Sequence, residues 1–223
     1  MISYKLYLIR HGLTDGNAEG RYIGSTDLPL SEAGREALMT LAETHEYPQV
    51  QMVFSSPLKR CTETADILFP DRMVRVVDDL REYDFGAFEG KSASELEHDP
   101  DFLRWCESGM REAPAGAERM PDFIARCEAG FEHVIEQMMK ERITEAALIL
   151  HSGVMMNLLS RYGYPKREPI RWTAESGHGF TALLTAALWQ RDKLFEVFDP
   201  IPYSLEETKE APSYRFFDLE SDD

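Results

Sequence analysis

The chain has 223 residues, of which 43% are hydrophobic, and its formal net charge at pH 7 is −16. This length and composition suffice for one domain with a sizeable core. The acidic balance, without a dense run of lysines and arginines, excludes the basic stripe that nucleic-acid binding needs. A site for anionic substrates must therefore gather its few cations locally.

The sequence carries no feature of a membrane or secreted protein. No apolar run reaches membrane-spanning length, and the N-terminus leads into a predicted strand rather than a signal peptide. The three cysteines, Cys61, Cys106 and Cys127, lack CxxC spacing, which argues against a disulfide framework or a thiolate metal site. We expect a cytoplasmic protein whose partners include neither nucleic acid nor membrane.

From the N-terminus, apolar runs that predict strands alternate with stretches that predict helices. We expect, in order, a strand over 6–9, a helix over about 32–45, a strand over 50–54, a helix over 57–68 and a strand over 73–77. Ser31 and Ser56 precede the two helices as N-caps. Pro57 adds a second start signal, because proline is favoured at the first helical position.

The middle of the chain is less regular. Residues 78–90 mix acids, aromatics and glycines without a regular period and predict an ordered loop. Residues 91–118 are polar and irregular, and predict short helices in an insertion. A long helix follows over about 120–142.

The last third returns to buried elements. We expect a strand over 146–150, a helix over 154–162, and a pair of strands over 180–189 and 194–198. Residues from about 200 to 223 contain prolines and many acids, and predict an irregular tail. The alternation of strands and helices indicates a single α/β domain over 1–223, with helices on both faces of the sheet.

Two predicted strands end in the same way. His11, between an arginine and a glycine, follows the first strand, and His151, before a serine and a glycine, follows the strand over 146–150. If these strands are parallel neighbours, the imidazoles meet at the sheet edge where ligands bind in open α/β sheets. Arg60 adds a cation in the first turn of a helix, whose N-terminus favours anions. These groups suit a dianionic phosphoryl group.

Four segments in order then carry a family resemblance. They are Leu-Ile-Arg-His-Gly at 8–12 with Asn17, Ser-Ser-Pro-Leu-Lys-Arg-Cys-Thr-Glu-Thr-Ala at 55–65, Leu-Arg-Glu-Tyr-Asp-Phe-Gly-Ala-Phe-Glu-Gly at 80–90, and His-Ser-Gly at 151–153. The set resembles the histidine phosphatase superfamily, the phosphoglycerate-mutase-like group with an Arg-His-Gly signature. Within it, the chain is similar to the phosphatase branch that includes α-ribazole phosphatase-like enzymes.

The resemblance implies a three-layer α/β sandwich with a mostly parallel central sheet and a small helical lid over about 91–140. It implies a phosphomonoester hydrolase that acts on a small phosphorylated metabolite through a phosphohistidine. No cofactor and no metal are implied. The chemistry agrees, because fixed cations can stabilise the charge of phosphoryl transfer to an imidazole.

The resemblance also implies roles for single residues. His11 is the implied nucleophile, and Glu82 the implied proton donor to the leaving oxygen, which needs a proton because an alkoxide leaves badly. Asp84 and Glu89 stay open as competitors for that role. The groups implied to hold the phosphoryl oxygens are Arg10, Arg60 and His151.

Substrate binding is assigned to Asn17, Gly24 and Ser152. Ile23 departs from the family pattern, because many relatives have a hydroxyl residue there, and it predicts a more apolar pocket mouth. His178, which precedes a predicted strand, stays open as a further residue of the pocket.

Two alternative functions stay open. The mutases of this family carry a longer, arginine-rich insertion, and residues 91–120 hold no paired arginines, which favours hydrolysis over phosphoglycerate mutase-type transfer. A non-catalytic phosphate-binding regulatory protein would lack His11, Glu82 or His151, and all are present. The physiological substrate and the oligomeric state, monomer or homodimer, stay open.

Overall fold

The computed structural model describes residues 2–204, with a seven-stranded sheet at the centre in the order β4-β3-β5-β1-β7-β8-β6. These strands are β1 (Ser3–Arg10), β3 (Met52–Ser55), β4 (Val74–Val76), β5 (Glu145–Leu150), β6 (Gly163–Tyr164), β7 (Gly179–Thr185) and β8 (Phe195–Ile201). All neighbours from β4 to β1 are parallel, whereas β7 is antiparallel to both β1 and β8. The expected mostly parallel sheet is confirmed.

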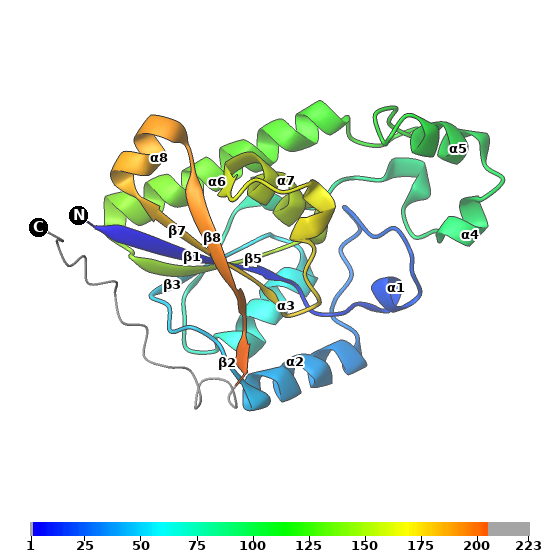
Figure 1. The fold of residues 1–223 in the computed structure, drawn as a ribbon. Helices are drawn as coiled ribbons and strands as arrows, with labels where there is room; N and C mark the ends of the chain where they lie inside the picture. Colours follow the sequence, from blue (N-terminus) through cyan, green and yellow to red (C-terminus); the bar gives the residue numbers. More distant parts are fainter. Residues whose placement is uncertain (1, 205–223) are drawn as a thin grey trace, which may run out of the picture.

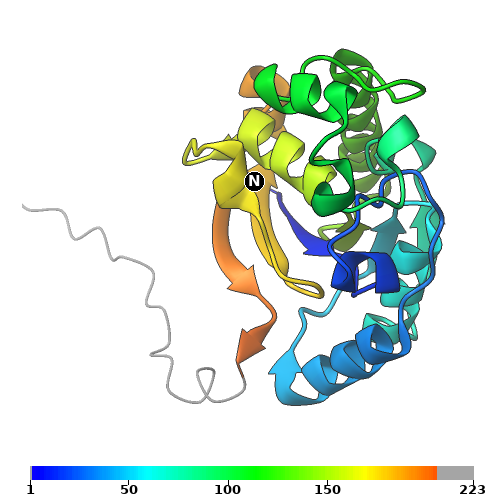
Figure 2. The ribbon, with the colours of Figure 1, turned by 90° about the vertical axis from the view of Figure 1, so that its right-hand side faces the viewer.

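Helices cover both faces of this sheet (Figures 1 and 2). They are α1 (Asp15–Ala18), α2 (Glu32–Thr44), α3 (Lys59–Leu68), α4 (Ala93–Leu96), α5 (Pro100–Glu107), α6 (Met120–Glu141), α7 (Ser152–Tyr162) and α8 (Ala186–Asp192). Successive side chains of a strand point to opposite faces. Leu6 and Leu8 of β1 therefore pack in the layer of α6 and α7, and Tyr7 and Ile9 in the layer of α2 and α3. The result is the expected three-layer α/β sandwich.

The segment between β4 and α6 forms the expected loop and insertion. Residues 78–90 contain only 3₁₀ turns, at Asp78–Leu80 and Gly86–Phe88, and residues 91–118 contain the short helices α4 and α5. A separate apolar cluster holds the insertion together, and consists of Phe88, Leu96, Phe102 and Trp105. The insertion lies beyond the end of the sheet toward which β1 runs (Figure 1), where a lid over a site at that edge would lie.

The start of α3 differs from the expectation. The helix begins at Lys59 rather than at Pro57, and its first turn has no side-chain cap from its own N-cap residue. Instead, the backbone N–H of Lys59 donates to Asp27 Oδ1 at 2.7 Å. The hydroxyl of Ser56 lies 2.7 Å from His151 Nε2. The Ser56 side chain, which the local pattern assigns to helix capping, thus makes a tertiary contact with His151.

Two expectations near the C-terminus are wrong. The strand expected over 180–189 ends at Thr185, whose hydroxyl accepts from Leu188 N at 3.2 Å and caps α8. Residues 200–204 are also not an irregular tail, because β8 extends to Ile201 and β9 (Tyr203–Ser204) pairs with β2 (His45–Glu46). The rest of the expected tail, 205–223, lies outside the described residues.

Within residues 2–204, no helix is both long enough and apolar enough to cross a membrane.

Candidate active site

The two histidines meet at the end of β1 and β5. These strands are parallel neighbours with Arg10 opposite Leu150, and the backbone N–H of His11 donates to Leu150 O at 2.9 Å. The ring centroids of His11 and His151 lie 5.1 Å apart in a T-shaped arrangement. The expectation that both imidazoles reach one sheet edge is confirmed.

The hydrogen bonds of His11 define its tautomer. Its Nδ1 lies 2.7 Å from the carbonyl oxygen of Gly12, and a carbonyl can only accept, so Nδ1 carries the proton and Nε2 the lone pair. Burial lowers the pKa of His11 to about 3, and the charges of Arg60 and Arg10 act in the same direction. The ring is therefore a neutral imidazole with an unprotonated Nε2 near neutral pH.

Arg60 and His151 are completely buried beside His11. Arg60 Nε donates to His151 Nδ1 at 3.2 Å, so the proton of His151 lies on Nε2, which faces Ser56. The terminal nitrogens of Arg60 donate to the carbonyls of Thr26 at 2.8 Å and Gly24 at 2.7 Å. Burial, followed by the charge of Arg60, lowers the pKa of His151 well below its ordinary value. Arg60 therefore places a positive charge beside His11, on the side away from the cavity wall. Its hydrogen bonds to Thr26 and Gly24 hold the loop at 24–26.

Glu82 is a buried carboxyl whose two oxygens are held by backbone donors. Oε1 accepts from its neighbour Tyr83 N at 2.9 Å, and Oε2 accepts from Gly153 N at 2.8 Å. Burial raises the pKa of Glu82, although these backbone N–H groups oppose the shift. The environment therefore favours a protonated carboxyl more than solvent does.

The two competing carboxylates are held in other ways. Glu89 accepts from the backbone N–H groups of Gly24, Ser25 and Phe85 at 3.0–3.1 Å, which orders the loop at 24–26. Asp84 accepts from Gly86 N at 2.8 Å. Neither lies on the wall of the cavity that contains His11, whereas Glu82 does.

That cavity has a volume of about 550 Å³. Of the expected site residues, it brings together Arg10, His11, Asn17, Glu82 and Ser152. Its outer wall comes from the lid, from α6 and α7, and from the segment after α1. It also includes Ile23, as expected for an apolar mouth.

Other expected residues do not reach the cavity wall. Arg60 and His151 lie behind it, and Gly24 uses its N–H and C=O on Glu89 and Arg60. His178 is also absent from the wall, and its Nδ1 lies 3.1 Å from Ser176 O. In the described part of the chain, no group of three or more His, Cys, Asp or Glu side chains could hold a metal ion.

Arg10 and Asn17 provide donors toward the cavity. Arg10 Nη1 donates to Ala174 O at 2.8 Å, which fixes the guanidinium beside His11. Asn17 Oδ1 accepts from Thr14 Oγ1 at 2.9 Å, so its amide nitrogen remains available for a ligand. A phosphoryl group bound at His11 Nε2 would meet these donors from the side of β1 and α1.

Arg126 on α6 was not anticipated from the sequence. Its guanidinium donates to the carbonyls of Asp79, Arg81 and Glu82 at 2.7–2.9 Å, and forms a paired contact with Glu118 at 2.7 and 2.8 Å. It therefore fixes the backbone from which the Glu82 side chain projects. No local spacing signals this contact, because it joins residues more than forty positions apart in the chain.

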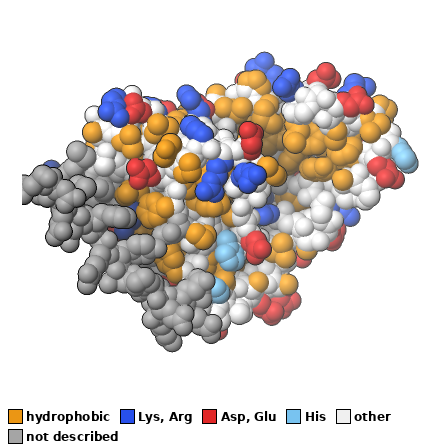
Figure 3. Space-filling view, in the orientation of Figure 1, with side chains coloured by type: hydrophobic (Ala, Val, Ile, Leu, Met, Phe, Trp, Pro, Cys, Tyr) orange, Lys and Arg blue, Asp and Glu red, His pale blue; other side chains and the backbone are white. Residues whose placement is uncertain are grey.

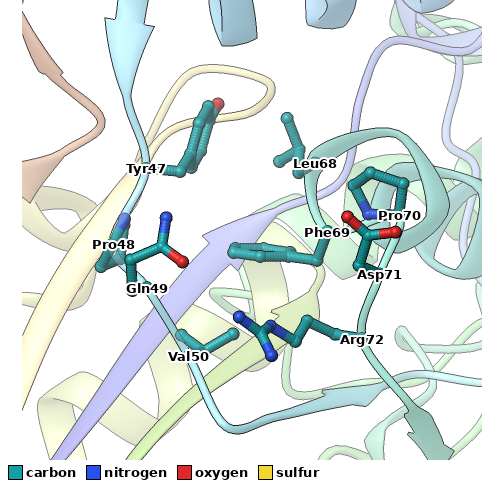
Figure 4. A pocket seen from close by; sticks show the side chains of 9 residues that line it. All are labelled: Tyr47, Pro48, Gln49, Val50, Leu68, Phe69, Pro70, Asp71 and Arg72. Atoms are coloured by element: carbon teal, nitrogen blue, oxygen red, sulfur yellow. The ribbon is translucent and has the colours of Figure 1, made fainter.

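A second, smaller pocket of about 150 Å³ is lined by other residues, which Figure 4 shows. The rings of Tyr47 and Phe69 form part of its wall, with Val50 and Leu68 beside them. None of the expected site residues lines it. The cavity that contains His11 and Glu82 is therefore the candidate active site.

Known proteins resemble this chain over most of its length. The model of the histidine phosphatase superfamily (branch 1) matches residues 6–184. Adenosylcobalamin/alpha-ribazole phosphatase of Escherichia coli (strain K12) is 29% identical over 178 residues, 78% of this chain and 86% of that protein. Phosphoglycerate mutase-like protein 4 of Arabidopsis thaliana is 30% identical over 166 residues, 70% of each. The crystal structure of the alpha-ribazole phosphatase of Shigella flexneri shares the fold, with a TM-score of 0.70 at 23% identity over 86% of this chain and 93% of that one.

Proposed function

The chain belongs to the histidine phosphatase superfamily (branch 1) and is a phosphomonoesterase, and we propose that it hydrolyses its substrates through a phosphohistidine on His11. The observation that carries this proposal is the contact of His11 Nδ1 with the carbonyl oxygen of Gly12 at 2.7 Å, which places the ring proton on Nδ1. A neutral imidazole with its proton fixed on Nδ1 presents the Nε2 lone pair, and Arg10 lies next to it at the same strand end.

In the first half-reaction, His11 Nε2 attacks phosphorus as the bond between phosphorus and the alcohol oxygen breaks. The leaving oxygen takes the proton of Glu82. Burial supports this role by raising the pKa of Glu82, and an arriving phosphate dianion raises it further through like-charge repulsion.

In the second half-reaction, water attacks the phosphohistidine. The Glu82 carboxylate accepts a proton from that water, the N–P bond breaks, and inorganic phosphate leaves with neutral His11 regenerated. One carboxyl thus serves as acid and then as base, and the proton balance closes over the cycle.

Fixed positive charge replaces a metal ion in this proposal. Arg10 would contact the phosphoryl oxygens directly, Asn17 would add an uncharged donor, and Ser152 a hydroxyl. Arg60 and His151 act from behind His11 in the present geometry. His151 Nε2 would have to leave its contact with Ser56 to reach the phosphoryl group, whereas Arg60 uses three of its five N–H donors on its present partners. Such preorganised donors stabilise developing charge without a metal.

Hydrolysis is favoured over mutase-type transfer by the charges of the cavity. Among the described residues of its wall, the arginines are Arg10 and Arg21. Arg21 is already paired with Glu19 at 2.6 Å and Glu95 at 2.8 Å. Among the described residues of this wall, a second phosphate would therefore find no arginine other than Arg10 and the paired Arg21.

Two assays test this function. The enzyme should release phosphate from p-nitrophenyl phosphate, and the His11→Ala variant should not. With the bisphosphate primer present, 2- and 3-phosphoglycerate should not interconvert. Efficient interconversion would establish the mutase alternative, and a chain that binds phosphate without any turnover would be the regulatory alternative.

A further inference from the structure

We infer that the preferred substrates carry a bulky, uncharged, apolar alcohol. The inference rests on the proposed function, because it concerns the leaving group of the same reaction. It follows from the wall of the cavity above the phosphoryl site, which is built mainly of aromatic and aliphatic side chains.

The lid side of the wall is aromatic. Tyr22, Phe85 and Trp105 pack on one another with ring centroids 5.2–6.2 Å apart, and Phe123 of α6 continues the wall. Among the described residues of the wall, the polar atoms that are buried without a hydrogen-bond partner include Trp105 Nε1, Tyr83 Oη and Asn157 Nδ2. The surface that lines the cavity is nevertheless mostly apolar, which favours an apolar partner.

Three methionines complete the wall. Met110 lies beyond α5, Met120 begins α6, and Met156 lies on α7. Methionine is unbranched and polarizable, and it adapts to differently shaped apolar partners. The wall therefore suits a range of apolar alcohols rather than a single rigid one.

The apolar surface continues to the cavity mouth. Met110 is 53% exposed and Ile170 is 70% exposed, although both are large hydrophobic residues. Apolar side chains also gather on the face around the lid in the space-filling view (Figure 3). Exposed apolar surface of this kind at a cavity mouth is typical of a ligand-binding site.

The volume of the cavity also favours a substrate with a bulky alcohol. A volume of about 550 Å³ lies in the range of sites that enclose drug-sized ligands, roughly 300–1,000 Å³. The alcohol part of a three-carbon sugar acid would fill only a small part of it. Its carboxylate would also face an apolar wall in a chain of net charge −16.

A series of n-alkyl phosphates from ethyl to hexyl tests the inference, because the basicity of the leaving alcohol stays nearly constant while its apolar surface grows. We expect kcat/KM to rise by up to about fourfold for each methylene that becomes buried. Phosphoserine and 3-phosphoglycerate should fall below the middle of this series.

Variants of the cavity wall test whether its side chains cause the rise in kcat/KM with alkyl chain length. Met110→Gln and Ile170→Gln should reduce the rise in kcat/KM with chain length, whereas a control variant outside the cavity should leave that rise unchanged. Both side chains are exposed, so neither change should prevent folding. The matched control is Met39→Gln, because Met39 on α2 is 51% exposed and does not line the cavity.

The outcomes separate this inference from the proposed function. Turnover that depends on His11 but stays flat or falls with chain length would overturn the inference alone. If no ester is turned over, the proposed function fails. The inference can then still be tested by calorimetry, which measures the binding of ethyl and hexyl phosphate to the His11→Ala variant. Tighter binding of hexyl than of ethyl phosphate would support the apolar cavity, and equal binding would overturn it.

Discussion

Replacing Arg126 by Met should destabilise the protein and also impair the acid step. Arg126 has 17% of its side chain exposed and donates to three backbone carbonyls and to Glu118. Losing such contacts costs about 1–3 kcal/mol for each buried group left unsatisfied. Here those groups are the Glu82 carbonyl and the Glu118 carboxylate, because the bonds to Asp79 and Arg81 are exposed. Water can reach part of this region through a cavity of about 310 Å³ that Arg126 and Glu82 line. We therefore expect a total loss of about 2–4 kcal/mol in the free energy of unfolding.

The effect on catalysis should depend on the leaving group. Without Arg126, the backbone that carries Glu82 loses three of its hydrogen bonds, and the carboxyl no longer holds one position. Phosphorylation by an alkyl phosphate should slow by roughly 10–100-fold, part of the range that general acid catalysis supplies. Phosphorylation by p-nitrophenyl phosphate should slow distinctly less, because p-nitrophenolate leaves without a proton.

Urea unfolding and single-turnover phosphorylation measure these two effects. Arg119→Met is the matched control, because Arg119 makes a similar paired contact with Asp122 but is 74% exposed. Such exposed pairs contribute about 0–1 kcal/mol. If Arg126→Met loses no more stability than the control, or slows both esters equally, Arg126 does not position Glu82.

Further predictions concern the acid, the pH dependence and the metal. Glu82→Gln should slow single-turnover phosphorylation by an alkyl phosphate by about 10²–10⁴-fold and by p-nitrophenyl phosphate distinctly less; equal losses would leave Glu82 a role in position or charge only. Because burial lowers the pKa of His11 to about 3, the phosphorylation rate should not fall as pH drops from about 7 to 5. It should fall toward alkaline pH as Glu82, whose pKa is raised, loses its proton; a loss on acidification centred near an ordinary histidine pKa of about 6.5 would contradict the lowered pKa of His11. Turnover should persist in chelator, and activity lost in chelator and restored by magnesium would refute metal independence.

The meeting of His11 and His151 could be predicted because its signals are local. Each follows a short apolar run that predicts a buried strand, and parallel strands bring their carboxyl ends to one edge. The lid as an insertion of short helices was predictable for a similar reason, since its irregular polar composition fits neither regular period.

The errors arose where a local pattern competed with tertiary contacts. Ser56 and Pro57 match a helix start, but His151 engages the Ser56 hydroxyl, and Asp27 satisfies the first backbone donor of α3. The apolar run after Gly179 fits a strand and a helix equally well, and Thr185 divides it into β7 and α8. A single-sequence pattern holds no information on such choices.

The burial of Arg60 also could not be predicted from the sequence. A cation in a first helical turn is usually solvated, yet Arg60 bonds His151 and the carbonyls of Thr26 and Gly24. Glu89 shapes the same loop from the other side. These residues were identified from their motifs, but their partners depend on how the loop at 24–26 folds back, and only the structure gives that.

The most direct test of the account is to trap the intermediate on His11. Brief incubation with phosphate-labelled substrate and an alkaline quench should leave label on the protein, because phosphohistidine survives alkali. Peptide mapping should find the label on His11, and the His11→Ala variant should acquire none. Label on another residue, or full labelling and turnover in the His11→Ala variant, would contradict the central claim.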